Sequence, residues 1–173
     1  MMEECLKLLL MRRSVRKFED REVGDEVIER VLEVARYAPS ARNSQPWEFI
    51  IIKDRKRIEE LGKIHKYAYP LRGAPLALVI LCDPKESPTS YIADCANVTT
   101  YVMLAAHALG LGTVWIQSLR DVERVNEIIG APKDKVPVAI LAIGWPAESP
   151  DPPRRKELSE LTHLNKYGER WKS

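Results

Sequence analysis

The chain reads Ala38-Pro39-Ser40-Ala41-Arg42-Asn43-Ser44-Gln45-Pro46-Trp47 between a helical pattern and an apolar strand pattern. Two prolines restrict this backbone, and the serine, asparagine and glutamine side chains offer hydrogen-bond donors and acceptors that neither neighbouring element needs. A rigid, polar connection between regular elements is well suited to form the edge of a ligand site. The same residues also suit a capped turn closed by a buried Trp47, so this stretch alone leaves both interpretations open.

A second polar cluster, Arg12-Arg13-Ser14-Val15-Arg16, follows the first predicted helix. Guanidinium groups are planar and can bind a phosphate group through two parallel hydrogen bonds, and a serine hydroxyl can add another. Basic residues at the C-terminal end of a helix also complement the helix dipole while they remain in water. The cluster therefore suggests a phosphate site without requiring one.

The two clusters belong to a longer series of motifs along the chain. Arg12-Arg13-Ser14-x-Arg16-x-Phe18 comes first, the proline-containing stretch continues to Phe49, and Leu109-Gly110-Leu111-Gly112-Thr113-x-Trp115-Ile116 follows, before Ile143-Gly144-Trp145-Pro146 and Lys166-Tyr167-Gly168. In content, order and spacing this series resembles the FMN-dependent nitroreductase family, of which the chain looks like a short, minimal member. The glycine motif is not a Rossmann fingerprint, because it ends a helix and precedes a strand.

The composition is that of a single globular domain, which we expect to span residues 1–173. Of the 173 residues 45% are hydrophobic, and 27 basic residues nearly balance 25 acidic ones. This balance provides no general attraction for nucleic acid, and neither basic patch shows a recognised nucleic-acid motif. No apolar stretch is long enough to span a bilayer and the N-terminus is unlike a signal peptide. We therefore expect a cytoplasmic protein without nucleic-acid or membrane partners.

The side chains that usually perform catalysis or bind metals are few and scattered. Cys5, Cys82 and Cys95 show no Cys-x-x-Cys or Cys/His spacing, which argues against a metal site and a disulfide framework and favours reduced, partly buried thiols. The histidines lie far apart in sequence, and His107, within an apolar helix, is expected to be a core residue. A chain without catalytic residues of its own is consistent with a cofactor that performs the chemistry.

Hydrophobic periodicity predicts an alternation of helices and strands. The predicted helices are 3–12, 25–38, 54–65, 92–109 and 122–129, and the predicted strands are 47–53, 75–82, 113–117 and 136–145. This alternation alone would indicate a parallel, doubly wound sheet. The resemblance instead implies an α+β fold with a central, mostly antiparallel sheet wrapped by helices.

The tail, residues 146–173, is expected to be an extended C-terminal arm. Prolines at 150, 152 and 153 favour an extended backbone, and Leu158, Leu161 and Leu164 make the tail too apolar to remain free in water. The tail could pack on its own subunit. The resemblance implies that it is exchanged between the two subunits of a homodimer.

By resemblance, the residues that bind FMN come from four parts of the chain. Arg12, Arg13 and Ser14 are expected at the phosphate and ribityl chain, with Arg155, or alternatively Arg154, adding a charge from the tail. Arg16 is expected near the pyrimidine side of the ring, where a fixed cation stabilises negative charge on the reduced flavin. The remaining positions are Pro39, Ser40 and Asn43, which would reach the flavin of the other subunit, and Trp115, Ile116 and Gln117, which would line the ring.

The function implied by the resemblance is that of an FMN oxidoreductase. Tightly bound FMN would accept hydride from NAD(P)H, the co-substrate, and reduce nitroaromatics, quinones or related small acceptors by a ping-pong mechanism. The alternatives are a specialised branch of the superfamily, such as reductive dehalogenation or flavin fragmentation, and a flavin-binding module without turnover. The physiological acceptor and the choice between NADH and NADPH stay open.

Overall fold

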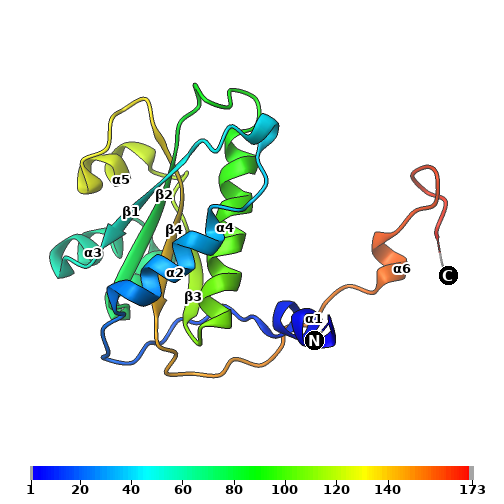
Figure 1. Ribbon diagram of the computed structural model, residues 1–173, viewed down its shortest axis with the longest axis horizontal. Helices are drawn as coiled ribbons and strands as arrows, with labels where there is room; N and C mark the ends of the chain where they lie inside the picture. The colour runs from blue at the N-terminus through cyan, green and yellow to red at the C-terminus, as the bar shows by residue number, and fades with distance from the viewer. Residues whose placement is uncertain (1, 172–173) are drawn as a thin grey trace.

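Four strands form one antiparallel sheet at the centre of the molecule, in a computed structural model that describes residues 2–171. In spatial order they are β1 (Trp47–Ile52), β2 (Leu76–Cys82), β4 (Val136–Gly144) and β3 (Gly112–Gln117), and each neighbouring pair is antiparallel. The α+β fold with an antiparallel sheet is therefore confirmed (Figure 1). The parallel sheet that the alternation alone would indicate is wrong.

Helix length explains why the alternation misleads. A strand of six or seven residues spans about 20 Å. α3 (Arg55–Leu61) and α5 (Val122–Ile129) are only 7 and 8 residues long, about 10–12 Å, so neither carries the chain from one end of a strand to the other. Each instead lies between antiparallel neighbours. α4 (Tyr91–Ala108), with 18 residues, is about 27 Å long and crosses the whole sheet from β2 to β3, leaving room for β4 between them.

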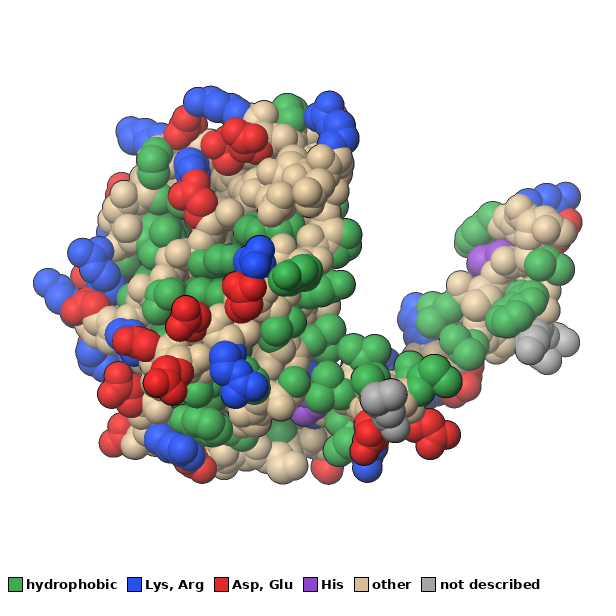
Figure 2. Space-filling view, viewed as in Figure 1, with side chains coloured by type: hydrophobic (Ala, Val, Ile, Leu, Met, Phe, Trp, Pro, Cys, Tyr) green, Lys and Arg blue, Asp and Glu red, His purple; other side chains and the backbone are tan. Residues whose placement is uncertain are grey.

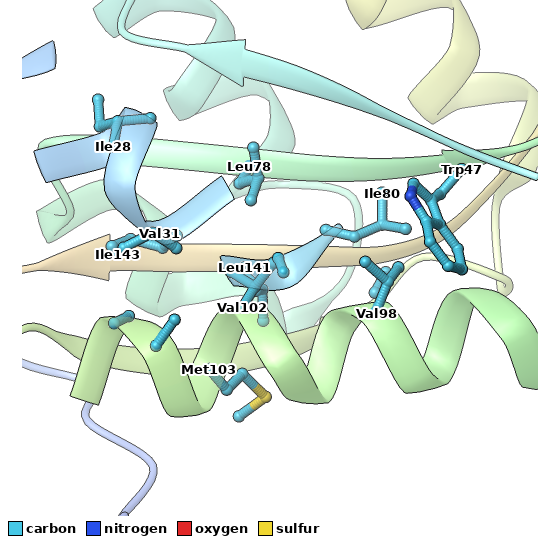
Figure 3. Close-up of a cluster of buried hydrophobic side chains, with 14 of the residues drawn as sticks. Ile28, Val31, Trp47, Leu78, Ile80, Val98, Val102, Met103, Leu141 and Ile143 are labelled. Carbon is cyan, nitrogen blue, oxygen red and sulfur yellow. The ribbon is translucent and has the colours of Figure 1, made fainter. Parts of the chain in front are cut away.

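Helices cover both faces of the sheet. α2 (Asp25–Ala35) and α4 lie on one face, where Val31, Val102 and Leu141 belong to one buried cluster (Figure 3). On the other face, α3, α5 and the 3₁₀ segment η2 (Lys66–Gly73) enclose a second cluster. β2 supplies both clusters with alternate side chains, such as Ile80 to the first and Val79 to the second. The central strands are thus buried on both faces, which explains their nearly continuous apolar sequences.

Several predicted boundaries differ from the structure for local reasons. The helix predicted over 54–65 ends at Leu61, and the chain then forms the unpredicted η2. Asp54 caps the start of α3 by accepting a hydrogen bond from the Arg57 backbone N–H at 2.9 Å. The long apolar helix predicted over 92–109 is α4, displaced by one residue at each end.

Two segments at the ends of the chain have no buried side chains of their own. α1 (Met2–Met11) buries none of its residues, and neither does α6 (Leu158–Leu161) within the tail. Figure 1 shows the tail running past α1 and away from the sheet, and Figure 2 shows hydrophobic side chains gathered on both segments. Within residues 2–171, no helix combines the length and apolar character needed to cross a membrane.

The cysteines differ from the expectation of three reduced thiols. Cys82 and Cys95 form a disulfide, and only Cys5 is free among the described cysteines. Cys82 ends β2 and Cys95 lies in α4, both in the buried cluster between sheet and helix. Their side chains meet because α4 packs on β2, a contact that has no signature in the spacing of cysteines along the sequence.

Candidate functional site

The arginine cluster is held against the start of β3 by the backbone. Ser14 pairs with Thr113 in a parallel bridge, and the Val15 N–H donates to the Thr113 carbonyl at 2.9 Å. On the other side, Glu148 Oε1 accepts hydrogen bonds from the Arg16 and Lys17 backbone N–H groups at 2.6 and 3.1 Å. The cluster therefore lies in a fixed strip between β3 and the first residues of the tail.

The glycines of the Leu-Gly-Leu-Gly motif permit this arrangement. Gly110 has a φ of +83° just after α4 ends, a left-handed conformation that favours glycine. A Cβ added at Gly112 would lie 2.7 Å from Val15 Cβ, so no larger residue fits where the arginine strip crosses β3. The motif thus serves the close approach of two backbone segments.

Four basic side chains and a serine surround one hollow of about 270 Å³. Its walls are formed by the arginine strip and the tail: Arg12, Arg13, Ser14, Arg16, Pro150, Asp151, Pro153 and Arg155. Of the two tail arginines considered from the sequence, Arg155 lines the hollow and Arg154 does not. The structure therefore brings together all the residues that the sequence predicts at the phosphate and the adjacent ring edge.

Arg12 is the arginine of this group that has a buried nitrogen without a hydrogen bond to the described residues. Its Nη1 is buried and has no hydrogen-bond partner among residues 2–171. Burial lowers the pKa of Arg12, and the positive charges of Arg13 and Arg155 lower it further. A buried guanidinium nitrogen without an acceptor is costly. An anion in the hollow would supply that acceptor and offset the mutual repulsion, so these residues fit the phosphate of FMN.

Arg13 makes a different contribution from Arg12. Its Nη1 donates to the carbonyl oxygens of Leu10 and Arg12, at 2.7 and 2.9 Å. These bonds satisfy carbonyl groups at the end of α1, where a cation also complements the helix dipole. Arg13 therefore combines the structural role considered from the sequence with a place in the wall of the hollow.

His107 is not the core residue that the sequence suggested. It is half-buried in the last turn of α4 and lines a hollow of about 460 Å³ that Arg12 and Arg13 also border. Burial lowers the pKa of His107, and the charges of Arg12 and Arg13 add to this effect. The apolar residues around His107 led to the wrong prediction. His107 lies on the side of α4 that faces the arginine strip, and not on the side that packs on the sheet.

The proline-containing loop lies at the opposite end of α4 (Figure 1). Pro39 and Asn43 are exposed and Ser40 is partly exposed, so their side chains are available for contact. The loop is bound near the start of α4, where Asp94 Oδ1 accepts the Ala41 backbone N–H at 2.9 Å. Within one chain the structure therefore does not bring this loop to the arginine hollow.

The third group of predicted residues lies on β3, where side chains alternate between the two faces of the sheet. Trp115 packs against the cluster shared with α4, and Gln117 is exposed. Ile116 is buried on the opposite face, in the cluster with α3 and α5. Ile116 could therefore meet a ligand beside α4 only through its backbone.

Two buried or bridging acids in this region were not predicted from the sequence. Asp94 binds the proline-containing loop, and Glu148 binds the arginine strip. The available signal for Asp94 is that it is the one acidic residue in a helix without lysine or arginine. Glu148 has no comparable signal, because its carboxylate meets the backbone N–H donors of Arg16 and Lys17 only after the tail folds over the strip.

Comparison with known proteins agrees with these motifs. The sequence profile of the nitroreductase family matches residues 9–70 and 63–145. A protein of Archaeoglobus fulgidus, provisionally named NADH dehydrogenase/NAD(P)H nitroreductase, is 38% identical over 156 residues, covering 87% of this chain and 90% of that one. The 5,6-dimethylbenzimidazole synthase of Rhodospirillum rubrum is 30% identical over 182 residues, covering 87% and 86%.

A solved structure extends the agreement to three dimensions. A provisionally assigned nitroreductase from Desulfovibrio desulfuricans, crystallised in complex with FMN, superposes with a TM-score of 0.86 at 27% identity, covering 94% of this chain and 97% of that one. The fold, the arginine strip and the profile match thus agree along most of the chain. Together they establish that this chain belongs to the nitroreductase family.

Proposed function

We propose that the protein is an FMN-dependent oxidoreductase that takes hydride from NADH or NADPH and reduces nitroaromatics, quinones or related small acceptors. The proposal rests on the hollow lined by Arg12, Arg13 and Arg155, in which the buried Nη1 of Arg12 has no hydrogen-bond partner among residues 2–171. Family membership and the FMN complex of a similar protein support the identity of the anion. Because the two substrates would use one pocket in turn, we expect ping-pong kinetics.

Different residues would bind the FMN phosphate and adjust the reduction potential of the flavin ring. Arg12, Ser14 and Arg155 would hold the phosphate through charge-assisted hydrogen bonds. Arg16, whose backbone N–H is fixed by Glu148, would place its charge beside the ring edge that becomes negative on reduction. When bound, FMN supplies the hydride-accepting and electron-donating chemistry. The protein would need no acid–base residue of its own for this hydride transfer.

The separation of the two predicted halves of the site supports a homodimer. The 13 residues from Asp94, near the loop, to His107, near the arginines, correspond to about 20 Å along α4. One flavin could touch both halves if two α4 helices pack antiparallel across a two-fold axis, since each loop would then meet the partner's arginines. The exposed leucines of α1 and of the tail would be covered in the same assembly, with the tails exchanged.

Light scattering tests the assembly directly. We expect the purified protein to elute as a dimer of twice the 19.8 kDa chain mass. A variant truncated before Leu158 should shift toward monomer, because it loses the exposed apolar residues of the tail. A wild-type protein that is monomeric at micromolar concentration would contradict both the dimer and the shared site.

An absorbance spectrum tests the activity. We expect the purified protein, or the protein supplied with FMN, to show flavin bands that bleach on anaerobic addition of NADH or NADPH. A nitroaromatic or a quinone should then restore the bands. Retained flavin that neither nucleotide reduces would favour the alternative of a binding module without turnover.

The similarity to a 5,6-dimethylbenzimidazole synthase favours one second candidate, formation of that compound. Mass spectrometry of reactions containing the holoprotein, NAD(P)H and oxygen distinguishes the two. The oxidoreductase proposal predicts reduced acceptor and no 5,6-dimethylbenzimidazole. The cytoplasmic location expected from the sequence stays a prediction.

A further inference from the structure

Asp94 is a buried carboxylate to which the proposed flavin chemistry gives no role. Its residue is only 3% exposed, although it lies in a helix whose other buried residues are mostly apolar. A buried carboxylate is stable only when its oxygens accept hydrogen bonds or meet a cation. Asp94 therefore needs partners from the structure around it.

Both oxygens of Asp94 accept hydrogen bonds from other segments. Oδ1 accepts the Ala41 backbone N–H at 2.9 Å, and Oδ2 accepts the Ser87 hydroxyl at 2.6 Å. Ser87 is itself buried, in the connection between β2 and α4. One carboxylate thus ties the proline-containing loop to α4 and to the segment that leads into α4.

The loop that Asp94 binds has an unfavourable backbone. Arg42, Asn43 and Gln45 have φ values of +53°, +55° and +48°, and none of them is glycine. Left-handed conformations at such residues persist only when surrounding contacts impose them. The Gln45 N–H donates to Ser40 Oγ within the loop, at 3.0 Å. The bond to Asp94 therefore attaches an internally constrained loop to a rigid helix.

A second contact attaches the same loop to α4. Asn97 Nδ2 donates to the Pro39 carbonyl at 3.3 Å, one turn after Asp94. The two anchor points flank Ser40, the residue between Pro39 and Ala41. The loop that carries Pro39, Ser40 and Asn43, the residues expected at the partner's flavin, is thus hydrogen-bonded to α4 at two points.

We propose that Asp94 is a positioning residue for the flavin site, which fixes the Pro39–Gln45 loop in the conformation that meets the partner's FMN. The inference rests on the proposed function, since it assumes that this loop contacts FMN. A carboxylate suits the role, because its two oxygens accept from an amide and a hydroxyl at once.

The test compares three substitutions in α4. Asp94→Ala removes both acceptors, whereas Asp94→Asn keeps the shape and one oxygen that can accept from Ala41. Thr99→Ala is the matched control, because Thr99 is buried in the same helix and its hydroxyl donates to the Cys95 carbonyl within α4, away from the loop. Thermal unfolding of each apoprotein reports the general damage to the helix.

Two measurements follow the loop and the cofactor separately. Hydrogen exchange of the apoprotein should be at least tenfold faster at Ala41 in Asp94→Ala, and unchanged in Thr99→Ala. The Kd for FMN should rise about tenfold in Asp94→Ala and less than threefold in Asp94→Asn. Rescue by asparagine together with a local change in exchange distinguishes positioning from a loss of core stability.

Other outcomes overturn the inference. FMN binding that falls in proportion to thermal stability in both alanine variants would make Asp94 an ordinary core residue. Faster loop exchange with unchanged Kd would show that the loop geometry does not serve FMN. If Asp94→Ala fails to fold, Ser87→Ala removes one bond of the pair, and unchanged exchange and Kd there would also overturn the inference. Failure of the proposed function is distinct, because the wild-type protein would then bind no FMN.

Discussion

Replacing Arg12 with alanine should weaken FMN binding by about 2–3 kcal/mol, which is roughly a 30- to 160-fold increase in Kd. The reason is the buried Nη1 of Arg12, which has no acceptor among the described residues and lies in the hollow lined by Arg13 and Arg155. A charge-assisted bond to phosphate would be lost with the side chain. Fluorescence titration of the apoprotein with FMN measures the change.

Arg154→Ala is the matched control for this prediction. Arg154 is adjacent in sequence to Arg155, has the same charge and is likewise exposed, but it does not line the hollow. Its removal should change Kd by less than twofold at moderate salt, where distant charges are screened. An unchanged Kd in Arg12→Ala would mean that its guanidinium does not contact the cofactor.

Removing the Cys82–Cys95 disulfide should lower the free energy of unfolding by about 3 kcal/mol. The cysteines are 13 residues apart, and cross-linking them restricts the unfolded chain over the loop that they close. Guanidinium unfolding of the oxidised protein and of the Cys82→Ala/Cys95→Ala variant measures the difference. Part of it will come from the lost packing of two fully buried side chains.

Thiol labelling provides the control for the disulfide. Without reductant, the denatured protein should react at Cys5 alone, and after reduction at all three cysteines. Cys5→Ser should leave the unfolding free energy unchanged within about 0.5 kcal/mol, because Cys5 is exposed. Labelling of three thiols before reduction would contradict the bond.

Much of the architecture follows from local sequence patterns. The apolar runs around Val79 and Ile140 predict central strands, and both residues are buried in the structure. Asp121 accepts the Arg124 N–H at the start of α5, and Gly130 ends that helix with a φ of +70°, as their residue types suggest. These signals act over a few residues, so the sequence alone is sufficient to locate them.

The alternation of helices and strands along the sequence does not determine whether neighbouring strands run parallel or antiparallel. A short helix such as α3 returns the chain to the end of the sheet that it left, whereas α4 crosses it. Helix length could have separated the two cases, because an 8-residue helix is shorter than the strands that it connects.

The sequence by itself determined the elements, the family and the residue types at the candidate site, because propensity, capping and motif spacing are local properties. The tertiary structure decided which distant groups meet. It brought Arg155 to the wall of the hollow, joined Cys82 to Cys95, placed Ile116 on the face away from α4 and bonded Asp94 to the loop. All four results depend on how separate elements of the fold pack together. The packing of helices on the sheet sets these distances, and it cannot be predicted from a short stretch of sequence.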